Sequence, residues 1–495
     1  MPVKADKLTF RRICDELFKL SVCIYLYGLI AAINNGKLIK FLAANLAIAC
    51  MGASMAWTSP MESKLKDMDE SPLPEAPTAS ELSWIGSILT LGSLLGPAFA
   101  GFVAHRFGRK LALLISAVFF LAAYVLFLTT QSVAQILVGR FLQGCGIGFA
   151  ITITPLYVGE IATVERRGAL GSLVQTFITL GLLLDYAIGP YVSYGAFQWI
   201  QMALPLLFVA GFVQMPETPH FYVSKGDYGA AARSLAYIRG EPISELQAEF
   251  NSIQFSVEES LRNRGTIKDL FIDHANFRAL IICTGVVVFQ QFSGINPVQF
   301  FAQTIFDRTG TDIPADLSAI VLGIFQVISS IVTALIVDRV GRRPTLLTSA
   351  FGMCCSLTAL GTYFYLDNQS SEVASTLTFL PVASLVLFVI MFCTGFGPIA
   401  WVLLGEMFAP SIKSLASSVV SSICWLTSFF ILFYFTSLDD ALGSHWLFWI
   451  FAVCCAMAFV FTYVFVVETK GLSLPEIQAR LNESAPVMAS ASDKC

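Results

Sequence analysis

Twelve long apolar stretches run along this chain, and they constrain its fold more than any other feature. A membrane-spanning helix needs about 20 mostly apolar residues, because each residue adds about 1.5 Å and the hydrocarbon core is about 30 Å thick. The pattern therefore predicts an all-α membrane protein. We expect its spans at residues 39–57, 84–104, 111–130, 133–158, 170–190, 197–215, 279–303, 317–337, 345–365, 378–404, 414–436 and 446–467.

The composition supports a membrane protein and argues against other classes. Of the 495 residues, 56% are hydrophobic and only 13% are charged, whereas soluble domains carry roughly 25% charged residues. The net charge of −4 is too small to indicate nucleic-acid binding. The cysteines lie mostly inside apolar stretches and form no C-x-x-C pair. We therefore expect neither an enzyme nor a metal or cofactor site.

The basic residues predict the orientation, because cytoplasmic loops are enriched in Lys and Arg. Of 30 such residues, twelve spans leave only Lys64, Lys66 and Arg308 in outer loops. Both termini are therefore expected to be cytoplasmic. The sequon that begins at Asn368 lies in an outer loop and is the expected glycosylation site, whereas the one at Asn482 lies on the cytoplasmic side.

Features of the first six spans recur in the last six, which indicates two homologous halves. The recurring features are a basic loop, an acid that ends a span and a short acidic motif. They pair His105–Lys110 with Asp338–Arg343, Glu160 with Glu406, and Pro216-Glu217-Thr218 with Val467-Glu468-Thr469.

The spans predict five regions. They are an N-terminal extension at 1–38, a six-helix bundle at 39–215, a cytoplasmic helical linker at 216–278, a second six-helix bundle at 279–467 and a cytoplasmic tail at 468–495. The extension holds a short apolar run at 20–33, which we expect to be an interfacial helix.

The paired basic loops resemble those of the major facilitator superfamily, and further runs resemble its sugar porter family. These runs are Pro155–Ala162 with Arg167-Gly168, Pro216–Pro219, Gln290–Asn296, Gly395–Trp401 and Glu468–Leu474. Within that family, Asn35–Lys37, Trp57–Pro60 and Ser83–Gly86 are most similar to the facilitated trehalose transporter branch of insects. The resemblance implies a major facilitator fold and facilitative (uniport) carriage of trehalose or of a hexose such as glucose.

Neutral amides inside apolar spans are the candidate sugar-binding residues. Sugar hydroxyls both donate and accept hydrogen bonds, as amides do, and a buried amide is costly unless it faces a partner or a wet cavity. The candidates are Gln175, Gln290, Gln291, Asn296 and Gln326, which by resemblance occupy sugar-contacting positions. We expect Ser293-Gly294 to loosen the seventh helix so that its amides face inward.

Aromatic residues complete the expected site. By resemblance, Trp401 follows a helix break at Gly397-Pro398 and stacks on the sugar ring, and Trp425 is a second candidate. Phe300 and Phe301 stand where relatives often carry two tyrosines, and are expected to close an outer gate. Cys424 departs from the family, because relatives often carry a sugar-contacting Asn there.

Charges at the cytoplasmic helix ends are the candidate inner gate. Their repetition in both halves favours ion pairs that close the inner side when the cavity opens outward and separate when it opens inward. The residues are Arg106, Arg109, Glu160, Arg167, Glu217, Arg339, Arg342, Glu406 and Glu468.

Two alternatives concern the mode of action. Proton-coupled relatives carry an acid in the first span, but Met51–Trp57 has none, which favours passive transport. Asp185, an acid within the fifth span, is a possible proton site and keeps proton-coupled symport open. A transporter-like sugar sensor is the other alternative. We expect a functional monomer in the plasma membrane, with a sugar and the lipid bilayer as its partners.

Overall fold

A computed structural model describes residues 36–163, 167–262, 266, 268–309, 313–369, 377–472 and 474–483. The apolar run at 20–33 lies outside this part of the chain. Within it, twelve helices are long and apolar enough to cross a membrane, which confirms the expected number of spans.

The first half contains eight elements. They are α2 (Gly36–Ala56), α3 (Thr58–Lys66), α4 (Ala79–Phe107), α5 (Arg109–Leu128), α6 (Val133–Ile161), α7 (Arg167–Ile188), the 3-10 turn η1 (Gly189–Tyr191) and α8 (Tyr194–Phe212). Four short helices follow, which are α9 (Pro219–Ser224), α10 (Tyr228–Arg239), α11 (Gln247–Arg262) and α12 (Asp269–Ile272).

The described residues of the second half and the tail form ten elements. They are α13 (His274–Phe292), α14 (Ile295–Phe300), α15 (Ala302–Asp307), α16 (Ala315–Val340), α17 (Arg342–Asn368), α19 (Leu380–Thr394), α20 (Phe396–Met407), α21 (Pro410–Leu442), α22 (Ser444–Phe465) and α23 (Leu474–Glu483).

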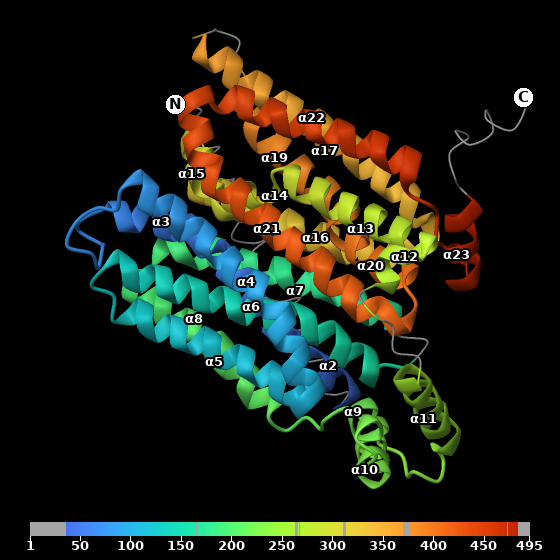
Figure 1. The fold of residues 1–495 in the computed structure, drawn as a ribbon. Coiled ribbons are helices and arrows are strands. Elements are labelled where there is room, and N and C mark those ends of the chain that lie inside the picture. The colour runs from blue at the N-terminus through green and yellow to red at the C-terminus, as the bar shows by residue number, and fades with distance from the viewer. Residues whose placement is uncertain are drawn as a thin grey trace, which may run out of the picture.

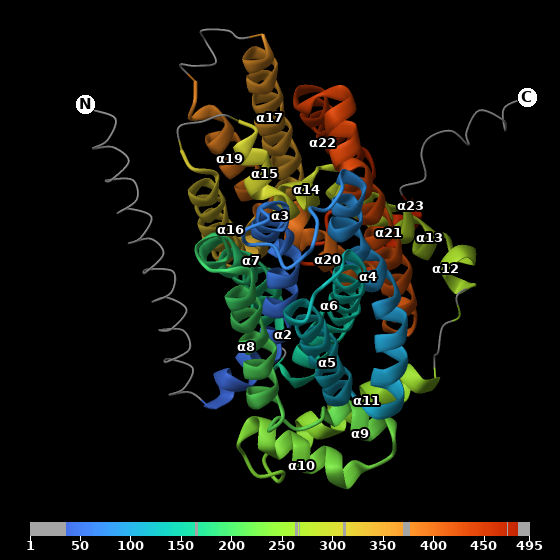
Figure 2. The same cartoon turned by 90° about the vertical axis from the view of Figure 1, so that its left-hand side faces the viewer.

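The two halves lie against each other along their length (Figure 1). Helix α4 packs along α21, and α7 packs along α16. Helices α9–α11 and α23 lie at one end of the bundle, and α3 and α15 lie at the other. We call these the inner and the outer end, following the orientation predicted from the basic residues. Figure 2 shows α3 beside α14 and α15 where the halves meet, and α3 contacts both.

The first span continues into a segment that the sequence predicts as an outer loop. Residues Thr58–Lys66 form α3, and Trp57 keeps right-handed helical angles between α2 and α3. Lys66 Nζ lies 2.8 Å from Glu62 Oε1, an (i, i+4) pair that supports a helix. Because Glu62 and Lys66 pair with each other one helical turn apart, the helix continues through this polar segment.

Two spans are broken at glycines. The break between α13 and α14 lies at Gly294, whose φ of 82° favours glycine, and this confirms the expected loosening. The break between α19 and α20 lies at Gly395, so the break expected at Gly397-Pro398 is wrong by two residues. A Cβ atom on Gly395 would lie 2.3 Å from Ser349 Cβ, whereas Pro398 is tolerated in the first turn of α20.

Glycines let α4 and α6 approach closely. A Cβ atom on Gly144 would lie 1.9 Å from the carbonyl oxygen of Leu89, and one on Gly96 would lie 2.3 Å from Gly148 Cα. The glycine-rich run in α6 therefore serves helix packing, as small residues do in membrane proteins.

Candidate functional site

The three amides on the broken seventh span form a chain of hydrogen bonds inside the second half. Gln290 Nε2 donates to the carbonyl oxygen of Phe396 at 2.7 Å. Phe396 is the first residue after the break between α19 and α20. Gln291 Nε2 donates to Gln290 Oε1 at 3.3 Å, and Asn296 Nδ2 donates to Gln291 Oε1 at 2.5 Å. All three are buried, so the amides join the two helix breaks of this half.

Two further residues of α21 extend this amide chain. Asn296 Nδ2 also donates to Ser428 Oγ at 2.5 Å, and Gln291 Nε2 approaches Cys424 Sγ at 3.1 Å. Cys424 thus takes a place in this chain of hydrogen bonds. Ser428 was not expected, because a serine in an apolar helix usually bonds its own backbone and carries no distinctive signal.

Gln326 on α16 differs from the other amides. Its side chain is 0% exposed, and neither its amide oxygen nor its amide nitrogen has a hydrogen-bond partner in the part of the chain that the structure describes. Buried polar groups are nearly always satisfied by protein, water or ligand. Gln326 therefore offers one donor and one acceptor to a polar molecule inside the bundle.

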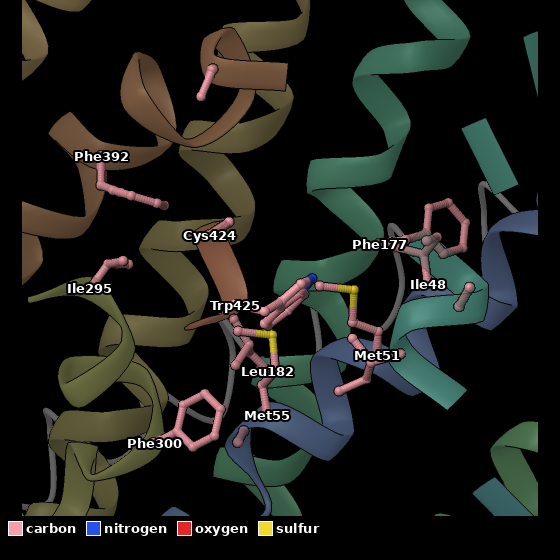
Figure 3. Packing of buried hydrophobic residues seen from close by; sticks show 14 of the residues in the cluster. Ile48, Met51, Met55, Phe177, Leu182, Ile295, Phe300, Phe392, Cys424 and Trp425 are labelled. Atoms are coloured by element: carbon pink, nitrogen blue, oxygen red, sulfur yellow. The ribbon is translucent and has the colours of Figure 1, made fainter. Parts of the chain in front are cut away.

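The indole of Trp425 lies where the halves meet. Figure 3 shows this ring extending from α21 toward Met51 and Met55 of α2, with Leu182 of α7 nearby. Trp425 is 5% exposed, and its Nε1 has no hydrogen-bond partner within the described ranges. The ring thus presents an apolar face and an unused donor at the seam.

The remaining two candidates are less enclosed. Gln175 on α7 is half-buried and lies beside Cys393 of the other half. Trp401 on α20 is also half-buried and packs against the hydrophobic core. The amide chain, Gln326 and Trp425 thus come from helices of the second half, whereas Gln175 approaches from the first.

The first half contains a charged cluster that the sequence did not assign to the site. Arg140 on α6 is 0% exposed. Its guanidinium donates to the carbonyl oxygen of Ser54 at 2.6 Å, to Gln143 Oε1 at 2.8 Å and to Thr58 Oγ1 at 2.9 Å. It also lies 5.9 Å from the ring centre of Phe300 in the other half. In the sequence, the only sign of this buried cluster was that Arg140 is a charged residue within a span.

Asp185, the possible proton site, lies in the same half. It is 0% exposed, and Gln201 Nε2 donates to its Oδ1. No described residue forms a hydrogen bond with its Oδ2. Arg140 is close enough to interact with it electrostatically. Asp185 is therefore enclosed by side chains of its own half rather than by the amide chain.

Phe300 and Phe301 lie where the halves close at the outer end. Both are buried, and Phe301 stacks on Phe435 of α21 with ring centres 5.5 Å apart. A Cβ atom on Gly86 of the other half would lie 2.7 Å from Phe301 Cζ, so the ring packs directly on that glycine. The position of both aromatics fits the expected outer gate.

The inner ends of the two halves carry matching charge clusters. Arg109 Nη2 lies 3.0 Å from Glu160 Oε1, and Arg342 Nη2 lies 2.8 Å from Glu406 Oε1. The other oxygen of each glutamate accepts a hydrogen bond at 2.5 Å, from Thr218 and Thr469 respectively. Each pair joins helices of one half. Arg106 is exposed, and the side chains of Arg167 and Arg339 lie outside the described part.

A second carboxylate in each cluster holds a basic loop. Glu217 Oε2 accepts from the backbone N–H of Lys110 at 2.9 Å, and Glu468 Oε2 accepts from that of Arg343 at 3.0 Å. The preceding glycines, Gly108 and Gly341, have φ values of 111° and 108°. A Cβ atom on either would lie within 3 Å of its carboxylate, so the turn requires glycine.

The pKa values of these two carboxyls shift in opposite directions. Burial raises the pKa of Glu217 and outweighs the backbone hydrogen bonds that it accepts. Burial would also raise the pKa of Glu468, but hydrogen bonds from the backbone of Arg342, Lys470, Arg343 and Thr469 outweigh it and lower this pKa. The difference follows from the deeper burial of Glu217.

Two halves of six spans each, two broken spans and polar groups buried inside each half define a transporter of the major facilitator type. A sequence model described as "Sugar (and other) transporter" matches residues 40–481. The chain belongs to this family.

Individual relatives agree with that family. The chain is 33% identical over 454 residues to the facilitated trehalose transporter Tret1 of Culex quinquefasciatus, covering 91% of this chain and 87% of that one. It is 34% identical over 446 residues to Tret1 of Apis mellifera ligustica, covering 90% and 88%. It spans only 56% of Tret1 of Anopheles gambiae, to which it is 33% identical.

Solved structures support the fold. The proton:xylose symporter XylE bound to 6-bromo-6-deoxy-D-glucose matches with a TM-score of 0.73 at 25% identity, covering 90% of this chain and 99% of that one. A partially occluded, inward-open conformation of XylE from E. coli matches in fold with a TM-score of 0.74 at 24% identity, covering 88% and 99%.

Proposed function

We propose that this protein is a facilitative sugar transporter that carries trehalose, or a hexose such as glucose, by alternating access. The amide of Gln326, which is buried on α16 and has no hydrogen-bond partner among the described residues, carries the proposal, because α16 packs along α7 of the other half. The relatives named as facilitated trehalose transporters favour trehalose and a passive mode.

The proposed site uses neutral groups because cargo has to be released. Hydrogen bonds to charged groups contribute about 1.5–3 kcal/mol, and bonds between neutral groups about 1 kcal/mol. Gln290, Gln291 and Asn296 bond to one another, and a sugar that binds them exchanges these bonds for bonds to its own hydroxyls. Gln326 and Trp425 add donors and an acceptor that the protein leaves free, and Gln175 and Trp401 complete the proposed set.

The variant Gln326→Leu tests this site. Removing an unsatisfied buried amide is expected to leave the melting temperature unchanged or raised, whereas sugar affinity should fall about tenfold with the lost hydrogen bonds. Thermal unfolding and sugar binding by the purified protein measure both effects.

A matched control is Gln198→Leu. The Gln198 side chain accepts from Trp57 Nε1 at 3.0 Å and donates to Met61 Sδ at 3.5 Å. Its loss should lower stability and leave sugar affinity unchanged. Wild-type sugar affinity in Gln326→Leu would refute the proposed site.

Proton-coupled sugar symport is the second candidate, because the Oδ2 atom of Asp185 is buried without a partner. An intramembrane carboxylate of this kind marks a possible proton path. Uptake of labelled sugar under an imposed pH gradient separates the two modes. Passive transport predicts no accumulation, and symport predicts accumulation that Asp185→Asn abolishes.

We also propose that the charges at the inner ends form an inner gate, which closes the inner side when the cavity opens outward and separates when it opens inward. The ion pairs Arg109–Glu160 and Arg342–Glu406 each join helices within one half. Sequence features support several finer points, namely the five-region division, cytoplasmic termini, a plasma-membrane location, a functional monomer and a glycan at Asn368. Asn368 is exposed at the outer end of α17, where a glycan has room.

A further inference from the structure

Among the described residues, three hydrogen bonds join the halves at the outer end, and all of them reach residues 299–304. The hydroxyl of Tyr186 donates to the carbonyl oxygen of Gln299 at 2.6 Å, and the backbone N–H of Gln303 donates to Ser59 Oγ at 3.1 Å. Thr304 Oγ1 donates to Glu62 Oε2 at 2.8 Å. Among these three bonds, only the last has a charged acceptor, and such bonds are the stronger ones.

Glu62 is held by its own half through its other oxygen. It is 7% exposed, and its Oε1 accepts from Lys66 one helical turn further along α3. When the halves separate at the outer end, the pair of Glu62 and Lys66 moves with α3, whereas the bond to Thr304 has to break. That bond is therefore specific to the closed state.

Helix α15 is also bound to α21 of its own half. Arg308, at the end of α15, pairs with Asp439 and Asp440 of α21. These contacts lie within one half and need not break during opening. Helix α15 is thus bound to α21 through Arg308 in every state, and to α3 through Glu62 only in the closed state.

A pocket of about 210 Å³ lies beside the hydrogen bond between Glu62 and Thr304. Both halves line it, and Glu62, Thr304 and Arg308 are among its lining residues. Water in this pocket replaces Thr304 as the partner of the carboxylate when the outer end opens. The cost of breaking the bond is therefore limited, as a gate that opens repeatedly requires.

We propose that Glu62 is a positioning residue of the transport cycle, which sets the balance between outer-closed and outer-open states through its bond to Thr304. This inference rests on the proposed function. Loss of one hydrogen bond to a charged acceptor is expected to shift the balance about tenfold toward the outer-open state. A ligand-independent shift of this kind changes the apparent affinities on the two sides in opposite directions.

The test compares sugar influx and efflux in oriented vesicles. Glu62→Ala and Thr304→Val should each lower the half-saturation concentration for influx and raise that for efflux, changing their ratio about tenfold. The double variant should change it no further, because both variants remove one bond. Glu62→Gln retains an acceptor oxygen and should give a smaller change.

The matched control is Glu70→Ala. Glu70 also lies at the outer end, but its partner is Lys64 of the same half, 2.5 Å away. Its loss should leave the ratio unchanged. A variant that merely folds poorly lowers both maximal rates without changing the ratio.

A measurement without sugar separates failure of this proposal from failure of the proposed function. Spin labels introduced as unnatural amino acids at exposed Glu75 and Gln369 report the distance between the halves at the outer end. Thr304→Val should populate longer distances. If it does so in a protein that transports no sugar, the gate stands and the sugar function fails. Unchanged distances and an unchanged half-saturation ratio overturn the role of Glu62.

Discussion

The inner ends of the two halves are near copies of each other, whereas their centres differ. At the inner ends, the pairs Arg109–Glu160 and Arg342–Glu406 have the same geometry. At the centres, the second half has the neutral amide chain and the first half has Arg140 with Asp185. The repeated inner ends fix the loops between helices. The centres, which differ, contain the groups suited to binding cargo.

The largest effect that sharpens this comparison is expected for Arg140→Met. The change leaves several buried oxygens without a donor and Asp185 without its nearby cation. Breaking such a buried network should cost about 3–5 kcal/mol, enough to lower the melting temperature by several degrees and the yield of folded protein.

Arg140→Lys should not rescue that loss, because an ammonium group cannot replace the planar fork that reaches Ser54 and Thr58 together. A melting temperature within one degree of wild type for Arg140→Met, by thermal unfolding in detergent, would remove the distinction between the two centres.

A smaller effect is expected at the aromatic outer gate. Gly86→Val forces the Phe301 ring away from α4, and overpacking of this kind costs about 1–3 kcal/mol in the closed state. The closed population should fall about fivefold or more. Distance measurements between outer-end labels detect the change.

Gly101→Val is the matched control for Gly86→Val, because both glycines lie on α4. Among the described residues, no side chain or distant backbone atom lies within 4 Å of a Cβ atom placed on Gly101. It should leave the distances as they are in the wild type. Equal behaviour of the two glycine variants would show that Phe301 does not close the outer end.

The smallest effect separates the two inner clusters through pH. The raised pKa of Glu217 means that its contribution to stability is greatest at low pH and is lost as pH rises through that pKa. The lowered pKa of Glu468 means that its contribution is present at neutral pH and is lost as pH falls through that pKa.

Glutamine variants isolate these contributions. Relative to wild type, Glu468→Gln should lose stability at neutral pH and approach wild type on acidification. Glu217→Gln should show the opposite slope. Melting temperatures recorded between about pH 4 and pH 7, around the ordinary pKa of a glutamate, measure both slopes. Slopes of the same sign would contradict the difference in burial.

Much of the fold could be predicted because span length and hydropathy are local properties. The twelve spans and the loosened helix at Gly294 were predictable in this way. Helix α3 could not be predicted in this way. Its support comes from the pairing of Glu62 with Lys66 and from burial against the second half. The break at Gly395 was misplaced because the contact with Ser349 that requires it is not local.

The site was predictable to a similar extent. Amides in apolar spans identified Gln290, Gln291 and Asn296, but not the partners Ser428 and Cys424 that complete their chain. Arg140 was visible as an intramembrane charge, yet its partners Ser54 and Thr58 lie more than 80 positions earlier in the sequence. Sequence patterns indicate which residues need partners, and only the packing of the helices supplies them.

Uptake of labelled trehalose and glucose into proteoliposomes that contain the purified protein tests the central claim most directly. The account predicts saturable uptake of at least one of the two sugars, reduced about tenfold at low sugar concentration in Gln326→Leu while that protein remains as thermostable as the wild type. Intact, monodisperse protein that admits neither sugar, or Gln326→Leu that admits sugar at the wild-type rate, would contradict it.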